Sequence, residues 1–449
     1  MEDMTVGSIR RHIIVFSFPL LIANLLQLAN LFVNRVWAGK FLGEDAISAI
    51  TVSMVVLYIM FSLAIGLTIG SSTVIAQYFG SKQEKKVGKA VALSFIIIMV
   101  IAAIMTFICI FFSGPLLKLM DTPYGIFIEA KNYLIISALG LIFLFGQVLI
   151  GFIFRAIGDS ITPLIFSSIS VVVNIILDPF IMLGIYPFPR LEVTGAAIAL
   201  VISQAVAFFF AIYFLQKKGG IVSLRKKNFV YNKEIIKNIL KLGVPTGIEN
   251  IAISTGIGIS QFFIDSFGTS AVASWAAVSV MINILLYISW SISAGVSVIA
   301  GQNMGAKNIE RVKETLKEGL KICILFAIVI TLISLLIPQY YLLIFLQHSN
   351  TEAINIGIYG SRVLAIPYIF LTMLMIYGSL FNGVGDNISA MIITIIGIWV
   401  FRIPLLALSS RIYGIHGLWI GLGLSYVLSG AVAYFYYKTG RWKKKGIIK

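Results

Sequence analysis

One carboxylate and its neighbours form the part of this sequence best suited to chemistry. Asn174 and Asp178 are four residues apart within an apolar run, so they lie on one face of a helix. Pro179 follows and removes a backbone hydrogen bond, which leaves a carbonyl oxygen free nearby. An ionisable residue inside a membrane span is costly and therefore marks a functional site. This group suits the binding of H⁺ or Na⁺; the alternative is a structural Asp178 that only hydrogen-bonds a neighbouring helix.

A stripe of amide side chains in the first apolar run offers a partner for this carboxylate. Steps of three, three and four residues keep its members on one helix face, and they are Asn24, Gln27, Asn30 and Asn34. We expect Asn34 to lie at the depth of Asp178 and to face it. Gln27 and Asn30 are candidates for the lining of a substrate cavity. Hydrogen bonding between helices, without any ligand, would produce the same pattern.

A second carboxylate lies in the predicted seventh span. Glu249 and Asn250 follow Pro245, about two turns from the predicted start of that span. We interpret both as candidates for the substrate cavity, with Glu249 as a second protonatable or cation-attracting group. The alternative is a carboxylate near the inner membrane interface that reaches Lys241 or water.

The sequence offers no catalytic centre, so we do not expect an enzyme. Cys109 and Cys323 lie inside apolar runs, as small buried hydrophobic residues do, and the three histidines do not cluster. No phosphate-binding loop occurs, so neither a nucleotide nor an ATPase partner is expected. The coupling ion, H⁺ or Na⁺ at Asp178, is the one cofactor we expect. Asp159 and Asp386 each follow a glycine and are predicted to form turns and helix N-caps.

The composition indicates an all-α polytopic membrane protein. Hydrophobic residues make up 59% of the chain and charged residues 12%, and the mean hydropathy is +1.00. A soluble domain is about 45–50% apolar. Twelve runs reach the length of about 20 apolar residues that a helix needs to cross the bilayer. Strands of a membrane β-barrel would be shorter and would alternate in polarity.

The basic residues indicate topology. Of 34 Lys and Arg residues, 25 fall on the side of the N-terminus and seven on the other side, with Lys321 and Arg402 inside spans. The positive-inside rule then places both termini in the cytosol and the chain in the cell membrane. The net charge of +16 does not indicate a nucleic-acid binder, because no basic helix face is evident.

The second half of the chain repeats the first. Residues 76–82 (AQYFGSK) correspond to residues 301–307 (GQNMGAK), 225 positions later, and residues 154–159 correspond to residues 381–386. Such self-similarity marks a duplicated fold. Six spans in each half return the chain to its starting side, so the halves form a parallel repeat, as in transporters that rock one half against the other.

The longest basic stretch separates the two halves. We therefore divide the chain into an N-lobe over 1–215, a basic cytosolic linker over 216–240 and a C-lobe over 241–449. Isoleucine and lysine alternate at helical spacing over 233–241, which predicts a short amphipathic helix on the membrane surface, unless this stretch is a solvated linker. Small residues four apart, Gly66 with Gly70 and their repeat mates Ser291 with Gly295, predict close helix packing.

Several segments together resemble the multidrug and toxic compound extrusion (MATE) family. They occur in the family's order and spacing over nearly the whole chain: VNRVWAGKFLG at 33–43, NIILDP at 174–179, GQNMGA at 301–306, GVGD at 383–386, WVFRIP at 399–404 and GRWK at 440–443. The resemblance implies twelve transmembrane helices in two pseudo-symmetric six-helix lobes around a V-shaped central cavity. It also implies export of cationic or amphipathic organic compounds in exchange for H⁺ or Na⁺, as multidrug efflux.

The resemblance also implies a cation-coupling site of Asp178, Asn174 and Asn34. Asn34 departs from the family, in which this position is usually Asp, and this departure puts the usual two-acid mechanism in doubt. We expect secondary antiport by a monomer in the lipid bilayer, with small organic substrates. The alternative is a lipid-linked saccharide flippase of the same superfamily, which the mainly acidic intramembrane charges disfavour.

Overall fold

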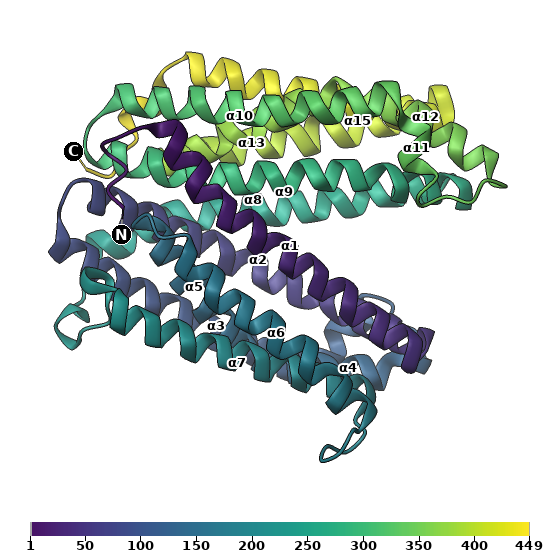
Figure 1. Ribbon diagram of the computed structural model, residues 1–449, viewed down its shortest axis with the longest axis horizontal. Coiled ribbons are helices and arrows are strands. Elements are labelled where there is room, and N and C mark those ends of the chain that lie inside the picture. The colour runs from purple at the N-terminus through teal and green to yellow at the C-terminus, as the bar shows by residue number, and fades with distance from the viewer. Residues whose placement is uncertain (1, 449) are drawn as a thin grey trace. The chain divides into compact units, whose positions relative to one another are not determined.

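The chain is helical from end to end. The computed structural model describes residues 2–448 and, within them, every side chain except those of Arg35 and Ala38; no strand occurs among these residues. The helices, drawn in Figure 1, are α1 (Ile9–Phe41), α2 (Glu44–Gly80), α3 (Glu84–Leu119), η1 (Tyr124–Ile126), α4 (Phe127–Leu139), α5 (Leu141–Ala156), α6 (Ile161–Leu183), α7 (Glu192–Lys218), η2 (Gly220–Val222), η3 (Lys226–Asn228), α8 (Lys233–Asp265), α9 (Thr269–Gly305), α10 (Ile309–Leu336), α11 (Pro338–Leu342), α12 (Thr351–Ala365), α13 (Pro367–Val384), α14 (Asn387–Ile395), η4 (Ile396–Arg402), α15 (Ile403–Lys438) and η5 (Arg441–Lys444).

These helices account for the twelve predicted spans. In the described part of the chain, nine helices are long and apolar enough to cross a membrane, and α4 with α5, joined at a 46° bend, makes a tenth. The run Asn387–Lys438 breaks at Gly414, whose φ of 58° and ψ of −139° are not helical, so this run supplies two spans. α8 has the length for a span, 33 residues, and its polar residues lower its hydropathy. The prediction of an all-α, twelve-span protein is confirmed.

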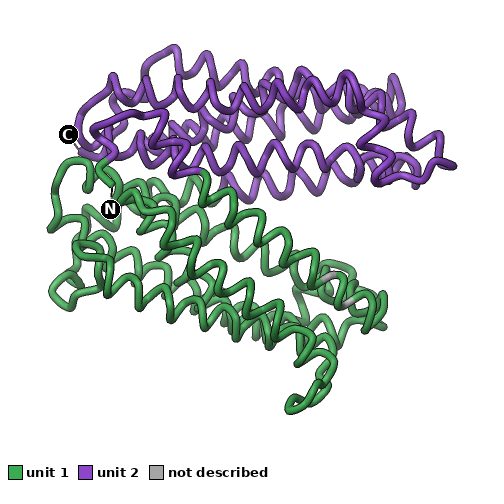
Figure 2. The backbone as a smooth tube through the Cα atoms, viewed as in Figure 1, with its two compact units in different colours: residues 1–3, 18–247 green, residues 4–17, 248–449 purple. Residues whose placement is uncertain are grey.

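The chain forms two compact units, coloured separately in Figure 2. Unit 1 comprises residues 1–3 and 18–247, and unit 2 comprises residues 4–17 and 248–449. These bounds differ from the sequence division into 1–215 and 241–449, because each unit includes the first turns of a helix that continues in the other. The change occurs next to a proline in both helices, Pro19 in α1 and Pro245 in α8.

Glycines explain how α8 begins in unit 1. A Cβ atom at Gly66 of α2 would lie 2.1 Å from the backbone nitrogen of Gly247, and one at Gly70 would lie 2.5 Å from that of Gly243. No side chain fits at such distances, so the two helix backbones are in direct contact. The predicted close packing at Gly66 and Gly70 is confirmed. In unit 2, Gly295 of α9 instead meets a side chain, since its Cβ would lie 3.1 Å from Ser17 Oγ.

The predicted amphipathic helix over 233–241 is wrong as a separate element. These residues are the first turns of α8, which runs without a break from Lys233 to Asp265. Ile235 and Ile239 are buried, at 1% and 0% exposure, because this end of α8 packs within unit 1. The isoleucines therefore cover protein rather than lying on a membrane surface.

The linker before α8 is held against unit 1. The short helix η2 contacts α3 and α7, and η3 contacts α3. Val222 is fully buried there. A Cβ atom at Gly88 of α3 would lie 2.5 Å from the side-chain nitrogen of Asn228, so Asn228 stands directly over the α3 backbone. The linker thus covers the surface between the start of α3 and the end of α7.

The two repeated Gly–Asp turns serve different ends. Both glycines have positive φ, 84° at Gly158 and 90° at Gly385, as predicted for turns. Asp159 accepts hydrogen bonds from the backbone N–H groups of the first turn of α6, which confirms the predicted cap. Asp386 stands at the N-cap position of α14, as predicted, but its side chain makes no capping hydrogen bond.

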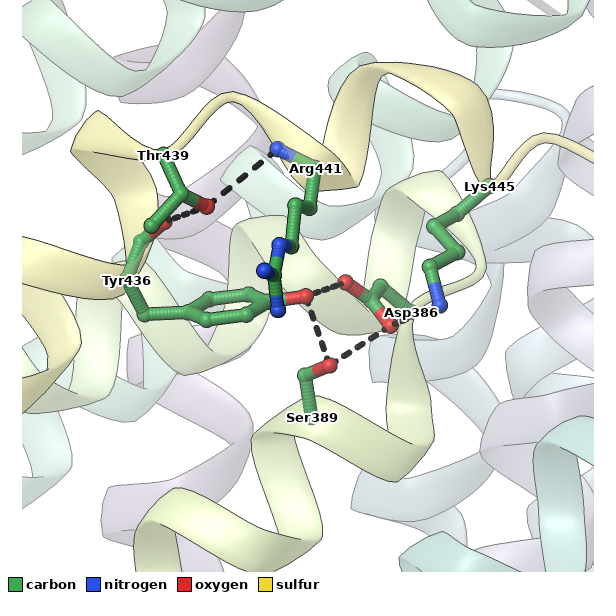
Figure 3. Close-up of polar contacts among 6 residues, drawn as sticks. All are labelled: Asp386, Ser389, Tyr436, Thr439, Arg441 and Lys445. Atoms are coloured by element: carbon green, nitrogen blue, oxygen red, sulfur yellow. Dashed lines mark hydrogen bonds and ion pairs between the residues drawn. The ribbon is translucent and has the colours of Figure 1, made fainter.

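Asp386 instead fastens the C-terminal tail of unit 2. As Figure 3 shows, it accepts hydrogen bonds from Ser389 Oγ (2.9 Å) and Tyr436 Oη (2.5 Å), and it pairs with Lys445 at 3.5 Å. Its side chain is 1% exposed, so these partners compensate a buried charge. The same turn sequence therefore ends in a helix cap in one unit and a tail anchor in the other.

Candidate cation-coupling site

Three polar side chains of unit 1 meet between α1 and α6. Asn34 Nδ2 donates to Asn174 Oδ1 at 2.9 Å, and Asn174 Nδ2 donates to Asp178 Oδ1 at 3.3 Å. Asn174 and Asp178 are each 1% exposed, and Asn34 is half-buried. The spacing of four residues brings the α6 pair together, as predicted, and the α1 stripe brings Asn34 to them. The coupling role of the three residues stays a prediction.

The third side of this triangle is the shortest. The second terminal atom of the Asn34 amide lies 2.6 Å from Asp178 Oδ2. An amide has its nitrogen on one side and its oxygen on the other, and which atom is which is assigned from the hydrogen bonds around it. The three side chains therefore form a ring of three contacts between Asn34, Asn174 and Asp178.

The number of donors decides which protonation state fits this ring. Each amide nitrogen can donate to one neighbour within the ring, so Asn34 and Asn174 supply two hydrogen bonds for three contacts. If Asp178 is ionised, one pair of oxygens must face each other however the amides are turned. If Asp178 carries a proton, its hydroxyl donates to Asn34 and all three contacts become hydrogen bonds. Among these three contacts, a proton on Asp178 gives a hydrogen bond at each one, whereas the Asn30 carbonyl, 3.2 Å from the same Asn34 atom, is satisfied only when that atom is the nitrogen.

The 2.6 Å contact also bears on the kind of ion. It lies in the range of O–H···O hydrogen bonds, about 2.5–3.0 Å. Even a small ion such as Mg²⁺ keeps its oxygen ligands about 2.0–2.1 Å away, which sets neighbouring ligands further apart than this contact. In the described part of the chain, no three His, Cys, Asp or Glu side chains come together as a metal site. A Na⁺ ion at Asp178 would therefore need amide, hydroxyl or carbonyl oxygens and a wider arrangement.

Tyr133 is a neighbour of the site that the sequence analysis missed. It lies on α4, is 2% exposed, and its hydroxyl is within the electrostatic influence of Asp178. Its position carries little signal, because Tyr133 stands where the mostly polar residues 129–132 give way to an apolar run, and tyrosine is common at such membrane interfaces.

The candidate cavity residues of α1 lie beside this site. Asn30 is half-buried one turn before Asn34, and its backbone carbonyl lies 3.2 Å from the Asn34 amide. Gln27 is exposed. The assignment of both residues to a substrate cavity stays a prediction.

Glu249 forms a separate buried site in unit 2. Its Oε1 accepts a hydrogen bond of 2.8 Å from Thr394 Oγ1 on α14, and the Asn382 amide of α13 acts on it as a second partner. Glu249 is 9% exposed and Asn250 is half-buried. The hydrogen bond from Thr394 does not support the alternative prediction, in which Glu249 reaches Lys241 or water. The sequence did not single out Thr394, because one threonine in an apolar run is common.

Helices of membrane-spanning length in two compact units indicate a polytopic membrane protein. The family model MatE matches residues 19–180 and 245–408, one segment in each half, and the chain belongs to this family. It is therefore a multi-pass membrane transporter and not an enzyme.

Individual relatives support this assignment along the whole chain. The chain is 28% identical to the probable multidrug resistance protein YpnP of Bacillus subtilis, over 98% of this chain and 97% of that protein. It is 25% identical to the probable multidrug resistance protein NorM of Thermotoga maritima, over 99% and 95% of the two chains. A crystal structure of a MATE protein in complex with MaL6 superposes with a TM-score of 0.91 at 20% identity, covering 98% of this chain and 99% of that one, and shares the fold.

Proposed function

We propose that this protein exports small cationic or amphipathic organic compounds across the cell membrane in exchange for protons. The family assignment supports a transporter, and the names of the relatives support multidrug efflux. The observation that carries proton coupling is the ring of Asn34, Asn174 and Asp178, which has a donor for every contact only when Asp178 is protonated.

The proposed cycle uses this ring as a clasp between α1 and α6. A proton that enters from outside neutralises Asp178, and its hydroxyl donates to Asn34, which holds α1 against α6. When the proton leaves toward the cytosol, two oxygens face each other at 2.6–3.3 Å and repel, so the clasp opens. The proton thus shifts the equilibrium between two conformations only as far as its affinity differs between them.

Asn34 gives this cycle a one-proton character. An amide cannot take up a proton in the physiological range, so Asp178 is the one titrating group of the ring. Glu249 and Asn250 are proposed to lie along the substrate path, with the carboxylate attracting a cationic substrate. Both termini are proposed to be cytosolic, on the positive-inside rule, and the working unit to be a monomer.

Transport in liposomes tests the proposal. The full chain is reconstituted into liposomes. The liposomes are loaded with ethidium as the probe and given either a pH gradient or a Na⁺ gradient of equal size. We expect ethidium movement to follow the pH gradient and to be insensitive to Na⁺. Transport that follows Na⁺ alone would contradict proton coupling. Transport of a lipid-linked saccharide, with none of ethidium, would support a flippase instead.

Two variants locate the coupling. Asp178→Asn removes the titrating group and is expected to abolish gradient-driven transport. The control is Asp45→Asn, which removes an exposed carboxylate at the start of α2 and should leave transport unchanged. If Asp178→Asn keeps full coupled transport, Asp178 is not the coupling residue.

A further inference from the structure

A groove lined by lysines opens on the surface of unit 2. It has a volume of about 540 Å³ and lies between α10, α13 and α15. Its lining combines basic, apolar and tyrosine side chains, namely Lys313, Leu316, Lys317, Leu320, Lys321, Ile324, Leu325, Ile328, Tyr377 and Tyr437. No carboxylate lines the groove among the described residues. The coupling site described above lies in unit 1 and shares no residue with it.

The three lysines form a row on one face of α10. Lys313, Lys317 and Lys321 are four residues apart, so their side chains follow one another along the helix. This is a basic helix face, which the sequence analysis did not expect. Below the row, toward the apolar end of α10, the groove continues over leucine and isoleucine side chains. A cationic rim above an apolar floor is thus built into a single groove.

Nearby glutamates neutralise two of the three lysines in part. Lys313 pairs with Glu310 and Lys321 with Glu318, each at 2.6 Å. Lys317, in the middle of the row, is exposed, and no carboxylate of the described residues is within ion-pair distance of it. The centre of the row is therefore a cation without a protein counter-ion.

The equivalent surface of unit 1 is covered, and none of its three equivalent positions is a lysine. At the repeat offset of 225, the three lysines correspond to Gly88, Ala92 and Ile96 of α3. There the linker closes the surface: η2 contacts α3 and α7, the mates of α10 and α15, and Asn228 stands over Gly88. In unit 2 the tail after α15 takes another course, since η5 contacts α13 and α15. The linker thus covers in unit 1 the surface that corresponds to the open groove in unit 2.

We propose that an anionic phospholipid fills this groove. The lysine row lies at the end of α10 that the positive-inside rule assigns to the cytosolic leaflet, where anionic lipids attract basic residues next to a span. The lipid phosphate would lie at Lys317, and an acyl chain would follow the floor from Leu320 to Ile328. A soluble anion would leave this apolar floor uncovered, so the groove favours a lipid.

Native mass spectrometry of the full chain in detergent tests this directly. The protein is titrated with palmitoyl-oleoyl phosphatidylglycerol and, separately, with phosphatidylcholine of the same acyl chains. We expect at least one phosphatidylglycerol to bind more tightly than phosphatidylcholine. Lys317→Gln should weaken the phosphatidylglycerol complex about fivefold, since a basic residue near an anionic lipid surface contributes on the order of a fivefold change in affinity. Lys317→Arg should keep the binding.

A matched control separates a site from general surface charge. Lys85→Gln removes one exposed lysine from the first turn of α3, where the linker covers the repeat-equivalent surface. It should leave phosphatidylglycerol binding unchanged. Equal weakening by Lys85→Gln and Lys317→Gln, or equal affinity for the two lipids, would overturn the proposal. Displacement of the lipid by inorganic phosphate would show an anion site rather than a lipid site.

Discussion

Each of the two units has a buried carboxylate that was a candidate for function, Asp178 in unit 1 and Glu249 in unit 2, and the two have different surroundings. Asp178 lies in a ring with two amides whose hydrogen bonds depend on its proton. Glu249 accepts a hydrogen bond from a threonine hydroxyl, which can be donated to a charged carboxylate and equally to a neutral carboxyl group. We therefore expect the hydrogen bonds around Asp178 to depend more strongly on protonation than the Thr394 hydrogen bond of Glu249 does.

The repeat explains why the two sites differ. The residue 226 positions before Glu249 is Ala23, so the carboxylate of unit 2 has no counterpart in α1. The helices and the prolines of α1 and α8 are repeated, whereas Asp178 and Glu249 are not. Duplication thus supplies two similar scaffolds, and each scaffold carries its own chemistry.

The comparison predicts its largest effect for the two carboxylates themselves. Asp178→Asn should abolish proton-driven ethidium transport, because no proton at this site can then shift the conformational equilibrium. Glu249→Gln, which keeps the Thr394 hydrogen bond, should reduce it by less, about threefold, through weaker attraction of the cation. Both are measured as initial rates in liposomes. Equal losses in the two variants would mean that the carboxylates act as one pair.

A second acid in the ring should change how steeply transport depends on pH. Asn34→Asp gives the ring two titrating groups, so the slope of log rate against external pH should rise from about one to about two per pH unit. Acid outside drives transport in both proteins, and the rate falls more sharply in the variant as external pH rises. Asn30→Asp, one turn away on α1, is the control and should leave the slope near one. An unchanged slope in Asn34→Asp would contradict the one-proton ring.

Much of this fold could be predicted from the sequence because its signals are local. Apolar run length gives the spans, and the spacing of Asn174 and Asp178 places them on one face. The contact of Asn34 with Asn174 and Asp178 could also be predicted, because a polar stripe along a span faces a cavity or another helix rather than lipid. What bends a span, such as the 46° angle between α4 and α5, depends on packing and has no such local pattern.

The missed features depend on contacts between segments far apart in the sequence. Tyr133 and Thr394 look like ordinary residues of apolar runs, and only the fold brings them to a carboxylate. The start of α8 was predicted to lie on the membrane because its isoleucines alternate with lysines. The same pattern suits a helix that packs on α2, and the glycines at 66, 70, 243 and 247 decide between the two.

Those glycine contacts give the next prediction, which compares the packing of the two units. Gly70→Val should lower the free energy of unfolding by about 1–3 kcal/mol, since the new side chain meets the α8 backbone at Gly243. Gly295→Val should cost less, because its neighbour is the movable Ser17 side chain at 3.1 Å. Thermal unfolding in detergent measures both. A larger loss for Gly295→Val would show that the contact between Gly295 and Ser17 in unit 2 is the more tightly packed of the two.

The smallest effect is expected at the partner of Glu249. Thr394→Val keeps the side-chain shape and removes the hydroxyl that donates to Oε1. Loss of this hydrogen bond to a buried carboxyl group should lower the free energy of unfolding by about 1 kcal/mol. The loss is measured as a lower unfolding temperature in detergent. Transport per folded protein and its pH dependence should stay unchanged, because the proposed coupling residue, Asp178, is untouched. Ser260→Ala is the control, since its hydroxyl donates to the carbonyl of Gly256 within its own helix. A changed pH dependence in Thr394→Val would instead assign the Glu249 site a part in proton coupling.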